Sequence, residues 1–241
     1  FVVGSTTPDI LPDTPSGITG KTNLTKITDG AVHFGANASD KLRFADSNDM
    51  SFGTNDFTFE TYYYHESQGS FDIMFDNLGS NRSGSQFSIN ASGNYAIEIG
   101  DGSGNWVWQH TSQPARVKRW THFAVTRQGS TFRAFVDGVQ FATTTSSTAI
   151  GNPQRNAIGG YTDNDSSNYG FNGFLSNMRI VNGTALYTSN FTPPTEPLTN
   201  VTNTKLLCCQ SPTSNTQATV IPDLANFPAP YSATARFGSY K

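Results

Sequence analysis

Short runs of β-branched and aromatic residues, separated by Gly, Asn, Asp and Ser, recur along most of this 241-residue chain. Helical periodicity is nearly absent, so the pattern predicts strands. The predicted strands are Ala31–Phe34, Lys41–Ala45, Phe57–Tyr64, Phe71–Phe75, Gln86–Asn90, Tyr95–Ile99, Trp106–Thr111, Trp120–Arg127, Thr131–Val136, Val139–Thr143, Asn156–Ile158, Gly173–Val181 and Lys205–Gln210. This many strands must stack as two sheets to bury their inner faces, which predicts an all-β antiparallel sandwich of the jelly-roll type.

Two turn signals support antiparallel pairing. Asp137-Gly138 separates two apolar runs and is typical of a tight hairpin. Gln128-Gly129-Ser130 joins the predicted strand Trp120–Arg127 to the predicted strand Thr131–Val136. Within Phe57–Tyr64, aromatic residues occupy both alternating sets of positions. Because successive side chains of a strand point to opposite faces, this strand is expected to be covered on both sides or to border a ligand face.

The composition favours a binding or structural protein of an exterior surface. Hydrophobic residues make up 35% of the chain and charged residues only 14%, which is typical of extracellular β proteins and viral structural proteins. The net charge is −3 and no basic stripe is present, so nucleic-acid binding is not expected. No apolar run approaches 18 residues, so no membrane insertion is expected.

The two ends differ from the middle of the chain. Residues 1–28 contain three prolines and are predicted to form an extended N-terminal arm, and the proline-rich residues 211–241 are predicted to form a C-terminal arm. Residues 29–210 are then the sandwich domain. Such arms commonly pack on neighbouring subunits, and disorder is the alternative.

The sequence resembles laminin-G-like domains of the concanavalin A-like type. The segment WTHFAVTRQG from Trp120 and the segment FRAFVDG from Phe132 match the two central strands of that family. AVHFG from Ala31 matches an opening strand, and FNGFLSNMRI from Phe171 matches a closing one. The resemblance covers about residues 28–210 and implies a concanavalin A-like lectin sandwich.

A narrower resemblance follows from the segment between Val181 and Gln210. Its sequence VNGTALYTSNFTPPT, followed by KLLCCQ from Lys205, is similar to laminin-G-like domains in virion proteins of tailed phages, especially marine cyanophages. That likeness implies a capsid-decoration or tail component on the particle surface. Its partners would be other virion proteins or copies of itself, bound through the arms, and host surface glycans. A cellular carbohydrate-binding adhesin is the alternative, with an extracellular location.

Two segments are candidates for glycan contact. Trp106, Trp108 and His110 alternate along one predicted strand and share a face, where they could stack on sugar rings or instead fill the core. Tyr161 and Tyr169 flank a polar loop and are candidates for the same role.

That loop also suggests a metal ion. Asp163, Asp165 and Asn168 offer hard oxygen ligands at short spacing, which suits calcium, although plain turns have similar sequences. The family resemblance implies the same, since laminin-G-like domains often carry calcium at a loop rim near the glycan site.

Catalysis is the least favoured hypothesis, and no catalytic residues are predicted. The paired carboxylates of glycosidases are absent, because Glu98 and Asp101 are three residues apart and Asp101 lies in a glycine-rich turn. His122 is expected to be structural. Cys208 and Cys209 are adjacent, so a disulfide between them would be strained, and they are interpreted as strand residues. A polysaccharide-cleaving enzyme remains a third possibility.

Overall fold

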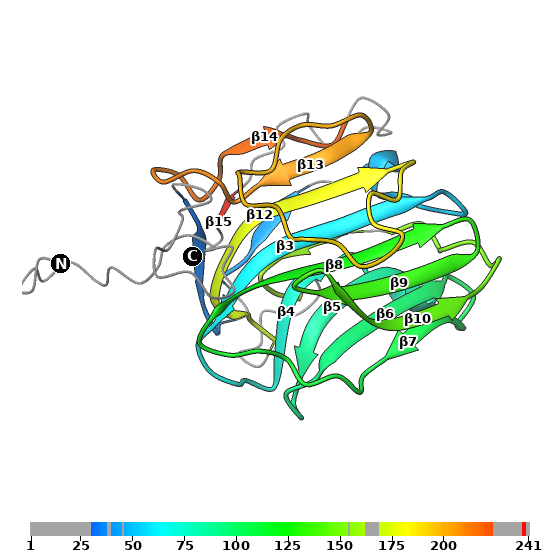
Figure 1. Cartoon of the computed structure of the whole chain (residues 1–241), viewed down its shortest axis with the longest axis horizontal. Coiled ribbons are helices and arrows are strands. Elements are labelled where there is room, and N and C mark those ends of the chain that lie inside the picture. The colour runs from blue at the N-terminus through cyan, green and yellow to red at the C-terminus, as the bar shows by residue number, and fades with distance from the viewer. Residues whose placement is uncertain are drawn as a thin grey trace, which may run out of the picture.

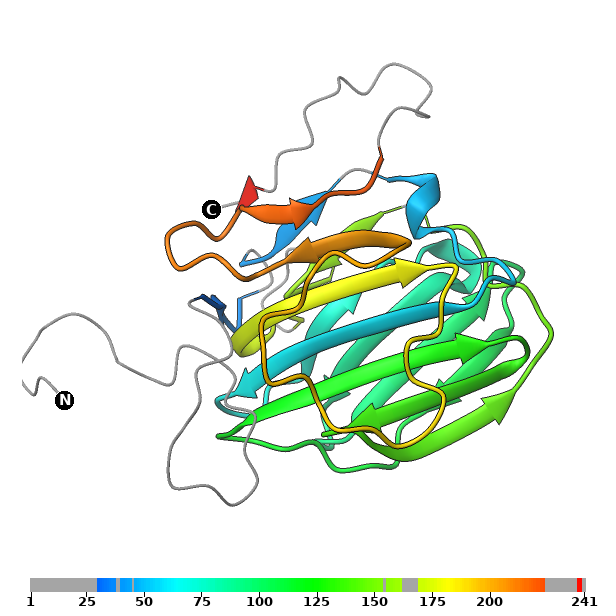
Figure 2. The same ribbon diagram turned by 45° about the horizontal axis from the view of Figure 1, so that its top comes forward.

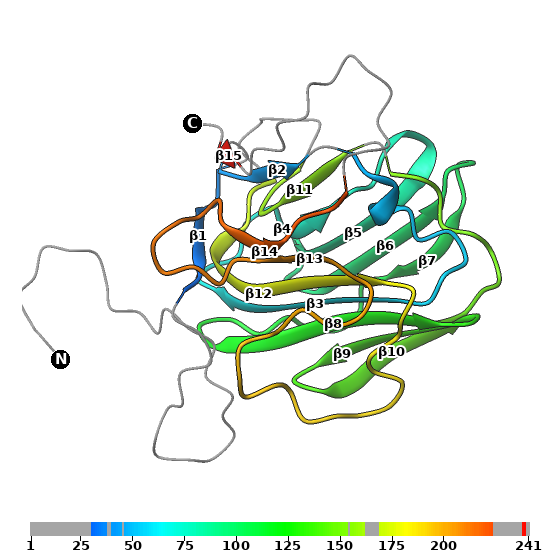
Figure 3. The ribbon, with the colours of Figure 1, turned by 90° about the horizontal axis from the view of Figure 1, so that it is seen from above.

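Two antiparallel sheets lie face to face in the computed structural model (Figure 1, Figure 3). The structure describes residues 30–37, 40–44, 46–153, 155–161 and 169–223, together with the backbone of 238–239. Among these residues there is no α-helix, only two single-turn 3₁₀ helices, η1 (Asn48–Met50) and η2 (Ser80–Arg82). The predicted all-β, two-sheet antiparallel fold is confirmed.

The first sheet has eight strands and the second has seven. In spatial order the eight-stranded sheet contains β10 (Val139–Thr145), β9 (Thr131–Val136), β8 (Trp120–Gln128), β3 (Phe57–His65), β12 (Asn172–Asn182), β13 (Thr204–Cys208) and β14 (Ala218–Val220), and β1 (Val32–Gly35) also pairs with β12. The seven-stranded sheet contains β15 (Gly238–Ser239), β2 (Leu42–Phe44), β11 (Asn156–Ile158), β4 (Phe71–Asp76), β5 (Ser83–Asn90), β6 (Tyr95–Asp101) and β7 (Trp106–His110).

The hairpin predicted at Asp137-Gly138 joins β9 to β10, with Val136 opposite Val139. Both turn residues have positive φ, 48° and 76°, as the tight turn that matches strand twist requires. A Cβ on Gly138 would lie 1.8 Å from the carbonyl oxygen of Phe191, so glycine is needed for space as well.

Aromatic rings fill the space between the sheets. The Phe59 ring centroid lies 4.6 Å from that of Phe87 and 5.5 Å from that of Phe75. These contacts join the two sheets, because Phe59 belongs to one sheet and the other two rings belong to the other. These side chains are fully buried. Burying each phenylalanine contributes about 1.5–3 kcal/mol, so this layer is the main source of stability.

The eight-stranded sheet continues past residue 210, where the sequence predicted the sandwich to end. Ala218–Val220 forms β14, which pairs with β13 through Cys208 and Leu207. An edge strand presents unpaired N–H and C=O groups, and a short added strand satisfies them. Of the predicted arms, residues 1–28 lie outside the described residues. No helix among the described residues has the length and apolar character needed to cross a membrane.

Candidate functional site

The outer face of the eight-stranded sheet is covered by the connection between β12 and β13, residues 183–203, here called the strap. It crosses in front of β8 and β9 (Figure 1, Figure 2). The Tyr187 and Phe191 rings stack at 3.7 Å with 6° between their planes, and both contact His122 edge-on. Tyr62 donates a hydrogen bond to the Pro194 carbonyl oxygen at 2.5 Å. The strap therefore covers this face around His122 and Tyr62.

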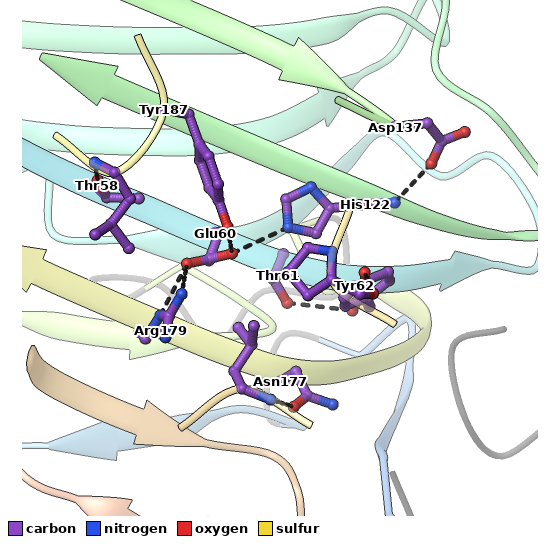
Figure 4. Close-up of polar contacts among 12 residues, drawn as sticks. Thr58, Glu60, Thr61, Tyr62, His122, Asp137, Asn177, Arg179 and Tyr187 are labelled. Atoms are coloured by element: carbon purple, nitrogen blue, oxygen red, sulfur yellow. Dashed lines mark hydrogen bonds and ion pairs between the residues drawn. The ribbon is translucent and has the colours of Figure 1, made fainter. Parts of the chain in front are cut away.

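A buried ionic cluster lies beneath the strap (Figure 4). Arg179 donates from Nε and Nη2 to Glu60 Oε1 at 2.8 and 2.6 Å. The other carboxylate oxygen, Oε2, accepts a hydrogen bond from the Tyr187 hydroxyl at 2.8 Å and lies 3.1 Å from His122 Nε2. The side chains of Glu60 and His122 are fully buried, and we call these four residues the Glu60 cluster.

The electrostatics of this cluster keep Glu60 ionised. Burial opposes ionisation, but hydrogen bonding and charge from His122, the Arg179 guanidinium and the Tyr187 hydroxyl outweigh it and lower the Glu60 pKa. Burial, together with the Glu60 charge, raises the pKa of Tyr187 above its usual range. The cluster is buried, and its contacts through Tyr187 hold the strap against β3, so it offers little surface to a ligand.

The outer face of the seven-stranded sheet is different, because polar residues lie in register across it. Residues directly opposite on neighbouring strands share a face, and the alternate positions, such as Phe75, Phe87 and Ile97, point into the core. The residues in one line on this face, here called the polar row, are Arg43, Asp76, Gln86, Glu98 and Gln109, with the buried Ala157 between Arg43 and Asp76.

Side-chain hydrogen bonds order this row. Gln86 Nε2 donates to Asp76 Oδ1 at 3.1 Å, and Gln109 Nε2 donates to Glu98 Oε1 at 3.0 Å. Asp76 is fully buried and Gln86 is 6% exposed, whereas Glu98 is half-buried and Gln109 is exposed. The row therefore presents one carboxylate and one amide to solvent at its β6–β7 end.

An aromatic group lies at the β4–β11 side of the same sheet. The Tyr169 ring is 5.7 Å from that of Tyr161 and 5.6 Å from that of Phe71, and the Arg155 guanidinium lies 5.5 Å from the Tyr161 ring centroid. Gly160 and Gly170 form an isolated bridge between the two tyrosines. The structure thus brings the two predicted tyrosines together, half-buried, at the base of one loop.

A carboxyl with an altered pKa stands beside this group. Burial raises the pKa of Asp46 to about 6, although the nearby Arg155 charge acts in the opposite direction. Lys41 is buried and donates from Nζ to the carbonyl oxygen of Tyr161 at 2.6 Å. Lys41 and Arg155 therefore both contact Tyr161, one through its carbonyl oxygen and the other through its ring.

The three predicted β7 residues do not form one platform. Trp108 is 6% exposed and belongs to the core, with its ring 5.9 Å from Phe132. His110 points the same way, 5.7 Å from Phe141. Trp106 is half-buried, and the Arg82 guanidinium lies over its ring, 4.5 Å from the ring centroid. A register shift between Ile99 and Gly100 separates Trp106 from the alternation that placed all three on one face.

The predicted glycan residues also lie at opposite ends of the sheet. Trp106 pairs with Gly100 beside the start of β5, whereas Tyr169 contacts Phe71, which pairs with the last residue of β5. The loop residues Asp163, Asp165 and Asn168 lie outside the described residues, so calcium binding there stays a prediction. Within the described ranges, no group of three or more His, Cys, Asp or Glu residues could hold a metal ion.

The polar row was missed in the sequence, although a signal exists. In β5 the residues Gln86 and Ser88 alternate with Phe87 and Ile89, and in β6 Glu98 alternates with Ile97. The alternation within one strand shows only which of that strand's residues share a face. Which polar residues share a line depends on the pairing of six strands, and no single segment contains that information.

Comparison with known proteins agrees with this architecture. The family model of the concanavalin A-like lectin/glucanases superfamily, of laminin G type, matches residues 34–188. No curated protein matches the chain. A crystal structure of a putative carbohydrate binding protein from Bacteroides ovatus is similar, with a TM-score of 0.57 and 16% identity over 78% of this chain and 52% of that one.

Domains LG4–5 of the mouse laminin α1 chain are also similar, with a TM-score of 0.50 and 14% identity over 78% of this chain and 48% of that one. The chain thus spans about half the length of these two structures. At sequence identities this low, the likeness shows a shared fold and nothing about function. The family model covers well over half of the chain, from β1 to the strap. The chain belongs to the concanavalin A-like lectin/glucanases superfamily.

Proposed function

We propose that this protein is a non-catalytic glycan-binding module that uses the outer face of its seven-stranded sheet. The observation that carries the proposal is the polar row with its exposed Glu98–Gln109 pair, on the same sheet as the Tyr161–Tyr169 group. Carboxylate and amide groups fixed by mutual hydrogen bonds can accept from and donate to neighbouring sugar hydroxyls, and a half-exposed ring supplies an apolar surface for the sugar. On the opposite sheet the strap covers the outer face around His122 and Tyr62, which favours this face for the ligand.

Hydrolysis is the competing hypothesis, because Asp76 and Glu98 share a face with one strand between them. Asp76 is fully buried, and its Oδ1 accepts hydrogen bonds from the Gln86 amide and from the Leu78 N–H at 3.1 Å. A carboxylate held in this way is poorly placed to reach a glycosidic bond. The geometry therefore favours binding over cleavage.

The double substitution Glu98→Ala with Gln109→Ala is expected to weaken glycan binding at least tenfold. Each lost hydrogen bond to a charged or polar group contributes about 0.5–3 kcal/mol, and 1.4 kcal/mol corresponds to a factor of ten. The wild-type chain is first screened on a glycan array, with and without a calcium chelator, and the affinity for the best glycan is then measured by calorimetry.

Val139→Ala is the matched control, since Val139 is an exposed residue of the other sheet. Unchanged affinity in the Glu98/Gln109 variant would contradict the assignment of the site. Sugar release from a polysaccharide by the wild-type chain, abolished by Glu98→Gln, would replace the binding proposal with the enzymatic one. Loss of binding with chelator alone would favour the loop of Asp163, Asp165 and Asn168.

We further propose that the module acts on a phage particle, as a capsid-decoration or tail component. The support is the resemblance of the Val181–Gln210 segment, which contains the strap, to virion proteins of tailed phages. Cryo-electron microscopy of the source particle is expected to show symmetry-related copies of this sandwich on the surface, where many weak glycan contacts add up. Absence of such copies from purified particles would favour the cellular adhesin instead.

A further inference from the structure

Cys208 and Cys209 lie side by side in space as well as in sequence, which a regular strand does not allow. Successive side chains of a strand point to opposite faces. Here the two Sγ atoms are only 3.6 Å apart, and both residues are buried, at 1% and 2% exposure. Neither cysteine forms a disulfide. The pair is therefore a dithiol whose sulfur atoms are already close together.

The backbone explains this arrangement. β13 ends at Cys208, and Cys209 has φ of 61°, in the left-handed region that side chains with a Cβ seldom adopt. Opposite it, Asn177 of β12 also has a positive φ, 51°, and its N–H donates to the Cys209 carbonyl oxygen at 3.2 Å. The β12–β13 ladder ends here at the Met178–Cys208 pair, and the register of β12 against β3 shifts between Ser176 and Arg179. The turn at Cys209 brings its thiol to the side of Cys208.

Neighbouring contacts hold this turn in place. The Gln210 amide donates to Asn177 Oδ1 at 2.7 Å and to the Leu198 carbonyl oxygen at 2.8 Å. Leu198 N–H donates to Asn177 Oδ1 at 2.9 Å. The end of β13, the bulge of β12 and the end of the strap are thus joined, so the sulfur separation is a fixed feature of the fold.

A cavity lies next to the pair. It is partly open, has a volume of about 260 Å³ and lies between β13, β14 and the intervening turn, with Cys208 and Gln210 among its lining residues. Both cysteines belong to the hydrophobic core, so a ligand that enters here must displace part of the surrounding packing before it bridges the two sulfur atoms, which are 3.6 Å apart.

The separation matches a bridging ligand better than a disulfide. A disulfide needs sulfur atoms about 2.05 Å apart, and adjacent residues have Cα atoms closer than disulfides usually allow. Two sulfur atoms bonded to one centre through bonds of about 2.3 Å lie about 3.3 Å apart at a pyramidal angle near 90° and about 3.8 Å apart at a tetrahedral angle. Contact with Cys209, together with burial, raises the pKa of the Cys208 thiol well above its usual value, which favours its protonated form.

We propose that Cys208 and Cys209 form a binding site for soft, thiophilic centres with two open positions, of which trivalent arsenic is the model. With phenylarsine oxide, two As–S bonds form, the As–O bond breaks, and the two thiol protons leave with the oxygen as water. No oxidant or reductant is needed. This site is separate from the glycan face, since β13 belongs to the other sheet.

The test uses the full chain, reduced with a phosphine and then incubated with phenylarsine oxide. Native mass spectrometry is expected to show one phenylarsenic group per folded chain in place of two hydrogens. Because the second As–S bond is intramolecular, the wild-type chain should keep the group at a monothiol concentration at least about a hundredfold higher than a chain with only one of the two thiols. Cys208→Ser and Cys209→Ser should each lose the group at the lower monothiol concentration.

Competition on the wild-type chain decides the question even if a serine variant fails to fold. Removal of the group from the wild-type chain by the monothiol at the same concentration that removes it from a one-cysteine peptide would overturn the proposal, since only one sulfur would then be bound. Failure of the folded chain to take up the group, while the chain unfolded in urea does, would also overturn it. Glycan affinity should stay unchanged when the group is bound, which separates this test from that of the polar row.

Discussion

Replacing Glu60 by glutamine is expected to destabilise the protein by about 3–5 kcal/mol, the cost of removing one partner from a buried ion pair. Arg179 Nη2 is 2.6 Å from the carboxylate and the Arg179 side chain is 7% exposed, so the variant leaves a buried positive charge unpaired. The Tyr187 and His122 contacts to the carboxylate weaken at the same time. For a domain of this size the melting temperature should fall by about 6–20 °C.

Urea unfolding of wild type and Glu60→Gln at several pH values provides the measurement. The Glu60 pKa is lower in the folded state, so its contribution is present above the pKa of the unfolded chain and is lost as the pH falls toward the folded-state value. The difference between the two proteins should therefore shrink in acid. Glu98→Gln is the control, because Glu98 is half-buried and its carboxylate contacts Gln109; its effect should be below about 1 kcal/mol. Equal stability of Glu60→Gln and wild type would show that the cluster does not hold the strap.

Replacing Trp108 by alanine is expected to cost about 3–5 kcal/mol, because it opens a large cavity between the sheets. The Trp108 side chain is 6% exposed and packs on Phe132 of β9. Trp106→Ala is the matched comparison on the same strand, and it loses mainly a partly exposed contact with Arg82, so its cost should be about 1 kcal/mol.

Denaturant midpoints and glycan affinities of both variants separate the two roles that the sequence left open for these residues. We expect Trp108→Ala to lower the midpoint while the folded fraction keeps its glycan affinity. A Trp108→Ala variant of normal stability that has lost glycan binding would mean that the ring faces the ligand rather than the core.

The sequence alone determined the class of fold, and the reason is local. Strand periodicity, the Asp137-Gly138 hairpin and the doubly aromatic strand at residues 57–64 all depend on neighbours in the chain. The last feature left two alternatives, a strand covered on both sides or one that borders a ligand face, and the structure favours the first, since Tyr62 and Tyr63 are both buried. The contact between Tyr161 and Tyr169 could be predicted from the sequence, because the two residues flank one short loop.

Only the tertiary structure decided which faces are closed and which side chains meet. Alternation placed Trp106 and Trp108 on one face, and a bulge created by pairing with β6 separated them. Nothing in the strap sequence shows that Tyr187 reaches Glu60, 127 positions away. The polar row needs six strands in register, and the thiol pair needs two left-handed residues facing each other across a ladder. Such features arise from contacts between distant segments, whereas a local pattern specifies only the two faces of its own strand.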